Sequence, residues 1–181
     1  MKRILAIIAS IVLLSVSVHA ADYMIELKTS YFTPSEQAFK DVYGSGMTFG
    51  GEVGITLWKG FGIWAGGDYF SRKGELTFTE ESTEIKIIPL YAGIRYQFRQ
   101  EKIAPYIGLG IGYFRFKETN PIGKVEEGDL GFIGQVGCLF RVVGSLFFDI
   151  KGSYSYCKAK PMDIEADMGG LKAGIGIGFE F

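Results

Sequence analysis

The chain has 181 residues, of which 48% are hydrophobic and 22% charged, with a net charge of −1 and a single histidine. This length suits one domain, and a mild acidic balance without a basic tract argues against nucleic acid as a partner. Beyond the first 20 residues no apolar run is long enough for a membrane-spanning helix.

Residues 1–20 have the features of a secretory signal peptide. Two basic residues, Lys2 and Arg3, precede an apolar run that ends near Val18-His19-Ala20, where small residues occupy the positions that a signal peptidase reads. We expect cleavage after Ala20, which removes the only histidine and leaves one domain over residues 21–181.

Eight later segments alternate large apolar residues with small or polar ones, the period of a β-strand with two unlike faces. The predicted strands cover residues 22–32, 47–57, 61–71, 85–98, 105–114, 130–142, 146–156 and 171–181. Short connections alternate with long polar ones, the known asymmetry of membrane barrels. The pattern therefore predicts an all-β fold, an eight-stranded antiparallel transmembrane up-and-down β-barrel.

Three local features add detail to this predicted barrel. Residues 34–43 predict a short helix that begins at Thr33 and Pro34 and ends at Gly44. The connection 72–83 keeps some alternation, which favours a hairpin projecting past the membrane. Pro89 lies inside the fourth strand and predicts a local irregularity, because proline lacks a ladder donor.

Alternation alone also fits a soluble barrel with an apolar interior. Three details favour the polar face as the inside: aromatic residues gather near both ends of the apolar face, glycine is frequent on the polar face, and charges lie four to nine residues deep. Isolated charges at that depth would be prohibitive. A balanced set can pair inside a closed barrel, and we interpret it as a polar plug made of Glu26, Lys28, Glu52, Asp68, Arg95, Asp149, Lys151 and Lys172.

The stretch from Ala104 to Tyr113 alternates with glycine, and the last eight residues, Gly174 to Phe181, alternate up to a terminal aromatic residue. In these patterns the chain resembles the small eight-stranded outer-membrane β-barrel family, which includes porin-like and adhesin-like proteins. The resemblance implies location in the cell outer membrane of a Gram-negative envelope. It also implies that Phe179 and Phe181 are the signal read by the barrel-assembly machinery, and that outer-membrane lipids and lipopolysaccharide are partners.

The two cysteines are predicted to be free thiols. Cys138 falls on the apolar parity of its strand and Cys157 on the polar parity of the next, and the intervening turn places Cys138 opposite roughly residue 150. Two residues on different faces and out of register cannot form a bridge.

No catalysis, cofactor or metal is predicted. Some barrels of this family are lipid A deacylases or palmitoyl transferases that use a histidine with a serine, and the mature chain has no histidine. The acidic pairs Glu80-Glu81 and Glu126-Glu127 lie in loops without histidine or cysteine at ligand spacing. The run Gly108 to Gly112 lacks the following helix that a phosphate loop needs.

Three functions remain open, and the first is preferred: a plugged structural barrel. The second is a porin-like conduit for small or hydrophobic solutes. The third is surface binding or adhesion through the loops 33–45, 72–83, 117–129 and 158–167. The plug predicts that Arg95→Ala destabilises the barrel by leaving acidic partners unpaired, and a conduit would also leak more in this variant.

Overall fold

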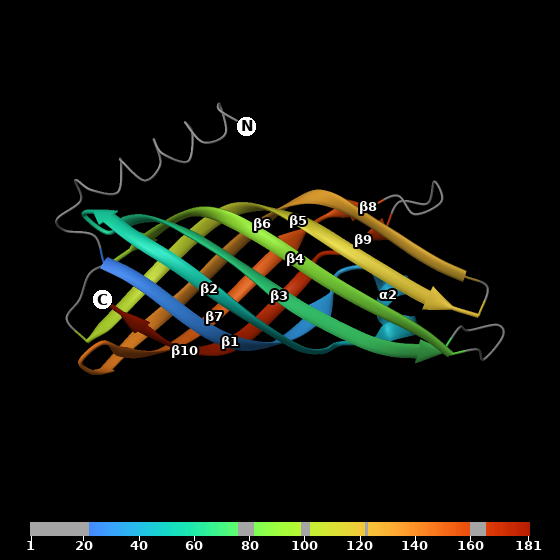
Figure 1. The fold of residues 1–181 in the computed structure, drawn as a ribbon, viewed down its shortest axis with the longest axis horizontal. Coiled ribbons are helices and arrows are strands. Elements are labelled where there is room, and N and C mark those ends of the chain that lie inside the picture. The colour runs from blue at the N-terminus through green and yellow to red at the C-terminus, as the bar shows by residue number, and fades with distance from the viewer. Residues whose placement is uncertain (1–21, 76–81, 99–101, 122, 160–165) are drawn as a thin grey trace, which may run out of the picture.

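Eight long antiparallel strands close into one barrel in the computed structural model, which describes residues 22–75, 82–98, 102–121, 123–159 and 166–181 (Figure 1). The order round the barrel is β1-β10-β7-β6-β5-β4-β3-β2, so the long strands pair in chain order. They are β1 (Asp22–Pro34), β2 (Gly46–Trp58), β3 (Phe61–Glu75), β4 (Ser82–Gln97), β5 (Ile103–Asn120), β6 (Gly123–Val143), β7 (Leu146–Tyr156) and β10 (Gly170–Glu180). The predicted eight-stranded up-and-down barrel is confirmed. The predicted signal peptide lies outside the described residues.

The terminal strand closes the barrel. β10 pairs with β1 from Met24↔Glu180 to Pro34↔Gly170. At the end of this seam, Tyr23 and Phe181 exchange backbone hydrogen bonds of 2.7 and 2.9 Å, and their rings stack with centroids 6.3 Å apart. The last residue of the chain is thus held at the seam.

The polar face of the strands lines the interior, as expected. On β1, Leu27 is 70% exposed while its neighbour Glu26 is 1% exposed. Glycine on the inner face makes room for long side chains, because a Cβ added to Gly137 would lie 2.5 Å from atoms of the Tyr106 ring. Among the described residues, no helix has the length and apolar character needed to cross a membrane.

Two of the predicted connections are shorter than expected. β5 continues to Asn120 and β6 begins at Gly123, so the predicted loop 117–129 is mostly paired strand. β3 and β4 likewise pair up to Glu75↔Ser82, which confirms the hairpin expected at 72–83, although residues 76–81 at its tip lie outside the described residues. Hydrophobic alternation stops where both faces of a strand meet water, so the sequence pattern ends before the hydrogen-bonded ladder does.

Pro89 causes a small irregularity. The β3–β4 pairing is interrupted between Gly67↔Leu90 and Phe70↔Ile87, with the same register on both sides. The bulges in the ladders lie elsewhere, next to the short turns, between Thr56 and Trp58 and between Arg141 and Val143.

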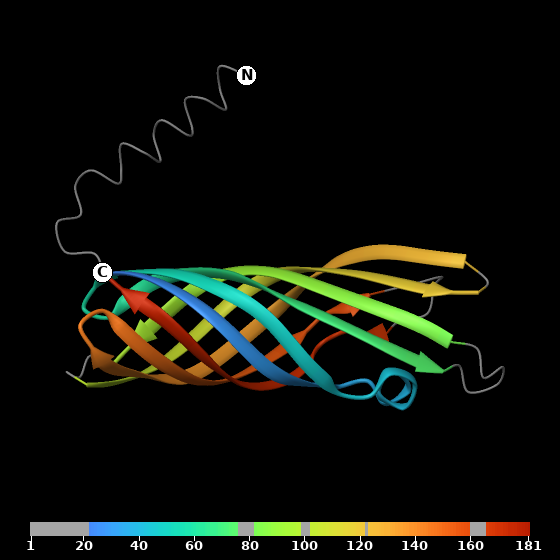
Figure 2. The same cartoon turned by 60° about the horizontal axis from the view of Figure 1, so that its bottom comes forward.

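The two ends of the barrel differ. At the end opposite the termini, which we call the outer mouth, β3 to β6 project farther than the other strands (Figure 2). The helix α2 (Gln37–Tyr43) lies at the same end and stops before Gly44, whose φ of 67° suits glycine. The strands β8 (Lys158–Ala159) and β9 (Ala166–Asp167) form a separate two-stranded sheet there.

Candidate functional site in the barrel interior and outer mouth

All eight charged residues predicted inside the barrel lie there, and their side chains connect into one set, here called the interior charge network. Seven are buried residues, and the side chain of the eighth, Lys28, is 7% exposed. The set contains four acidic and four basic residues, drawn from six strands, β1, β2, β3, β4, β7 and β10. Its formal charges therefore cancel.

Glu52 on β2 is the centre of this network. Its carboxylate forms an ion pair with Arg95 from β4 and lies 3.4 Å from Lys28 Nζ and 3.5 Å from Lys151 Nζ. The Arg95 guanidinium also stacks over the Tyr106 ring, 4.4 Å from its centroid. Because β7 and β2 are not neighbours in the barrel, the contact of Lys151 with Glu52 crosses the interior.

Toward the outer mouth the network continues through Asp68. This carboxylate lies 2.6 Å from Lys172 Nζ and 3.3 Å from Lys28 Nζ. The Tyr91 hydroxyl donates to Asp68 Oδ1 at 3.1 Å and is also within hydrogen-bond reach of Lys28. The contact between β10 and β3 is again one between strands that do not pair.

Toward the short turns the network ends at Lys151, Glu26 and Asp149. Lys151 Nζ donates to Glu26 Oε2 at 2.8 Å and lies 2.9 Å from Asp149 Oδ2. The Tyr106 hydroxyl donates to the same Asp149 oxygen at 2.7 Å. The hydroxyls of Tyr91 and Tyr106 were missed as members of the network, although the parity of each strand already placed both rings inside.

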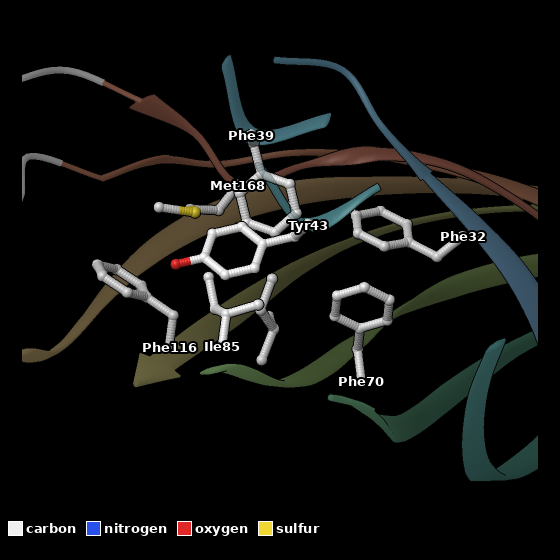
Figure 3. Close-up of a cluster of buried hydrophobic side chains, with 8 residues drawn as sticks. Phe32, Phe39, Tyr43, Phe70, Ile85, Phe116 and Met168 are labelled. Carbon is white, nitrogen blue, oxygen red and sulfur yellow. The ribbon is translucent and has the colours of Figure 1, made fainter. Parts of the chain in front are cut away.

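An apolar layer covers the network at the outer mouth, and sequence reasoning missed it. Buried side chains from β1, α2, β3, β4, β5 and the residue after β9 pack together there (Figure 3). We call this the outer-mouth cluster: Phe32, Phe39, Tyr43, Phe70, Ile85, Ile87, Phe116 and Met168. Several of these residues occupy the inward parity near the strand ends, where a polar interior was expected. Large apolar residues at inward positions beside a predicted helix were the available signal.

The helix α2 supplies the central part of that cluster. Phe39 and Tyr43 turn inward from it, with ring centroids 5.0 Å apart (Figure 3). The Tyr43 hydroxyl is hydrogen-bonded to the Thr83 hydroxyl at 3.1 Å. Burial raises the pKa of Tyr43 to about 12, so the phenol is neutral at physiological pH. Its contribution to stability is complete below pH 10 and is lost as the pH rises through 12.

Between the charge network and the outer-mouth cluster lies a cavity of about 10 Å³, lined by residues of both, including Asp68, Phe70, Met168 and Lys172. This is about the space of one water molecule. The two layers therefore lie almost directly against each other.

The cysteines are free thiols, as predicted. Cys138 is opposite Ile150, which matches the register read from the turn. Cys157 is buried at the outer end of β7, and its Sγ lies 3.7 Å from the Asp129 carbonyl oxygen. Burial, with Asp129 and Asp167 nearby, raises the pKa of this thiol to about 11.

The remaining predicted site residues lie away from the interior. Phe179 and Phe181 are on the outer face, 54% and 70% exposed, and their reading by an assembly machinery stays a prediction. Within the described part of the chain, no three His, Cys, Asp or Glu side chains gather as metal ligands would.

A closed antiparallel barrel with an apolar exterior, a charged interior and unequal ends defines a membrane β-barrel of the outer-membrane class. The chain matches the family named Outer membrane protein beta-barrel domain over residues 6–181, and it belongs to that family. Membership implies the outer membrane as its location. No curated protein matches the chain in sequence.

Solved structures share the fold at low sequence identity. Neisserial surface protein A is 14% identical with a TM-score of 0.65, over 88% of this chain and 97% of that one. The N-terminal β-barrel domain of Pseudomonas aeruginosa OprF is 15% identical with a TM-score of 0.59, over 88% and 97%. Ail, the attachment invasion locus protein of Yersinia pestis, in complex with the heparin analogue sucrose octasulfate, is 16% identical with a TM-score of 0.59, over 88% and 99%. At these identities the likeness shows the fold alone.

Proposed function

We propose that this protein is a closed outer-membrane barrel with a structural role, without catalysis and without an open pore. The observation that carries the proposal is the interior charge network, in which eight side chains from six strands are connected and Glu52 contacts three of the four cations. An eight-stranded barrel is only wide enough for side chains to fill it. The contacts that cross between non-neighbouring strands occupy this width.

Energetics also favour closure. A solute that crossed this level would have to separate ion pairs such as Lys172–Asp68, 2.6 Å apart and buried on both sides. Separating a buried pair leaves uncompensated charges, at a cost of about 3–5 kcal/mol for each pair broken. The outer-mouth cluster adds an apolar layer above the network, which an ion would also have to cross.

The test is reconstitution of the mature chain in liposomes. A heat-dependent gel shift first establishes that the barrel is folded, and the release of solutes of graded size is then compared with that of protein-free liposomes. We expect no release above the protein-free level. Reproducible, size-limited release by the folded wild type would refute the closed barrel and favour the conduit.

Arg95→Ala is the matched variant, because it removes the guanidinium that pairs with Glu52 and covers Tyr106. We expect lower stability toward urea. If this variant changes neither stability nor release, the interior charge network does not close the barrel. Binding of a surface ligand by the outer loops stays a prediction that these measurements do not address.

A further inference from the structure

Among the described residues of the eight long strands, outward-facing charge is confined to one place. The outward positions of β1, β2, β7 and β10 carry no charged residue. On β3 to β6, described outward side chains are charged only near the outer mouth, where five basic residues stand against two acidic ones, Glu84 and Glu126. We call this face the cationic wall, and its basic residues are Lys73, Lys86, Arg115, Lys117 and Lys124.

The strand register places the wall directly above the apolar surface. Leu90, Tyr113 and Leu130 form one row across β4, β5 and β6, and all three are largely exposed. The next outward position on β5 is Arg115, and the one after it is Lys117, which pairs with Lys86 on β4. Apolar and cationic rows thus follow each other on one continuous face of the strands.

The height of the wall matches a headgroup layer. Lys117 is four residues beyond Tyr113, about 13 Å along an extended strand and roughly 9 Å along the barrel axis at a tilt of about 45°. The polar layer on each side of a bilayer core is about 5–8 Å deep. If the row of Tyr113 marks the edge of the core, Arg115 stands within the headgroup layer and Lys117 at its outer edge.

The protein neutralises these cations only in part, because Lys86 Nζ lies 3.1 Å from Glu84 Oε1 but two carboxylates face five basic residues. Lys86 and Lys117 are direct cross-strand partners, an arrangement that is destabilising for like charges. Among the described residues, Lys117 has no carboxylate at salt-bridge distance, whereas Arg115 and Lys124 share Glu126. The adjacent Lys124, and then Lys86, lower the pKa of Lys117. An anionic group between these side chains would relieve the repulsion.

We propose that the cationic wall binds the phosphate groups of a phosphorylated lipid whose acyl chains lie on the apolar rows below. The lipid is favoured over a free anion because the phosphate site and the apolar surface share one outward face, which a membrane lipid can contact at both levels. Lys86 and Lys117 supply point charges to the phosphate. Arg115 donates from Nε and Nη2 to Glu126, and its remaining N–H groups can donate to the phosphate. This site is independent of whether the barrel interior conducts.

The experiment titrates the refolded barrel, in zwitterionic detergent micelles, with diphosphoryl lipid A and with the same lipid after dephosphorylation. The variant Lys86→Gln/Lys117→Gln removes two charges from the wall. A basic residue near an anionic lipid surface is worth about fivefold in affinity, so the double variant is expected to weaken binding by about 25-fold. The charge-preserving variant Lys86→Arg/Lys117→Arg should bind like the wild type.

The matched control is Lys40→Gln, because Lys40 is exposed at the same end of the barrel but lies on α2 rather than on the wall. It should bind like the wild type, and the heat-dependent gel shift verifies that every variant is folded. Equal affinity for the dephosphorylated lipid would overturn the proposal, as would wild-type affinity in the Gln double variant. Equally tight binding of inorganic phosphate alone would overturn the assignment to a lipid.

Discussion

Replacing Glu52 by Gln tests the centre of the interior charge network. The change keeps the shape of the side chain but removes the negative charge that faces Arg95, Lys28 at 3.4 Å and Lys151 at 3.5 Å. Four cations then face three carboxylates in a site where Glu52 is only 2% exposed. Removing one partner from a buried ionic cluster costs about 3–5 kcal/mol, which shifts the unfolding equilibrium by roughly two to three and a half orders of magnitude.

The assay is equilibrium unfolding in urea in lipid vesicles, followed by Trp64 fluorescence in a Trp58→Phe background. Trp64 is buried inside the barrel and donates to the Ile94 carbonyl oxygen at 3.1 Å, so its emission reports loss of the closed interior. The matched control is Glu126→Gln, which removes an exposed carboxylate paired with Arg115 and Lys124. Exposed pairs contribute at most about 1 kcal/mol.

A rescue variant makes the explanation specific to charge. Glu52→Gln combined with Arg95→Met removes one charge of each sign, so three cations again face three carboxylates. Replacing a buried ion pair with groups of similar volume is often close to neutral, and the double variant should regain most of the lost stability. The reasoning fails if Glu52→Gln costs no more than Glu126→Gln.

Three further perturbations follow from the structure. A Cβ at Gly176 would collide with the Glu26 carboxylate, whereas at the outward Gly152 the nearest atom is 3.9 Å away. Gly176→Ala should therefore lower the urea midpoint by an amount equivalent to about 1–3 kcal/mol. Gly152→Ala should leave the midpoint unchanged or raise it. Phe39→Ala removes a ring from the outer-mouth cluster. Hydrogen–deuterium exchange of the α2 amides, measured by mass spectrometry, should then be at least tenfold faster while the strands stay protected. Unchanged exchange would mean that the ring does not hold the helix. The pKa of Cys157 is raised from 9.0 to about 11. At pH 8, iodoacetamide should therefore label Cys157 about a hundredfold more slowly in the folded Cys138→Ser barrel than in the same variant unfolded in urea. Equal rates would contradict the burial of this thiol.

The sequence determined the strands and their faces because a strand has a period of two. That period, with one face in lipid and the other in a narrow interior, makes the pattern readable from residue types alone. It assigned Glu26 and Lys28 to one side of β1 and Leu27 to the other, which the structure confirms. The separate faces and register of Cys138 and Cys157 excluded a bridge by the same logic.

The pattern fails where its physical cause ends. Beyond the membrane both faces of β5 and β6 meet water. The polar pattern of residues 117–129 therefore predicts a loop, although the backbone continues the ladder to Asn120↔Gly123. Inside the outer mouth, α2 changes the environment of the inward positions from polar to apolar. Phe32 and Phe116 are buried in the cluster to which α2 contributes Phe39 and Tyr43.

What the tertiary structure alone decided is which charges meet. Parity places Lys151 and Glu26 inside the barrel, but they are 125 residues apart in sequence and lie on strands that do not pair. Their 2.8 Å contact depends on the barrel's curvature, on the tilt of its strands and on glycines such as Gly176 that leave room for the side chains. A one-dimensional pattern carries the direction of each side chain, whereas the distance between two of them exists only once the sheet has closed.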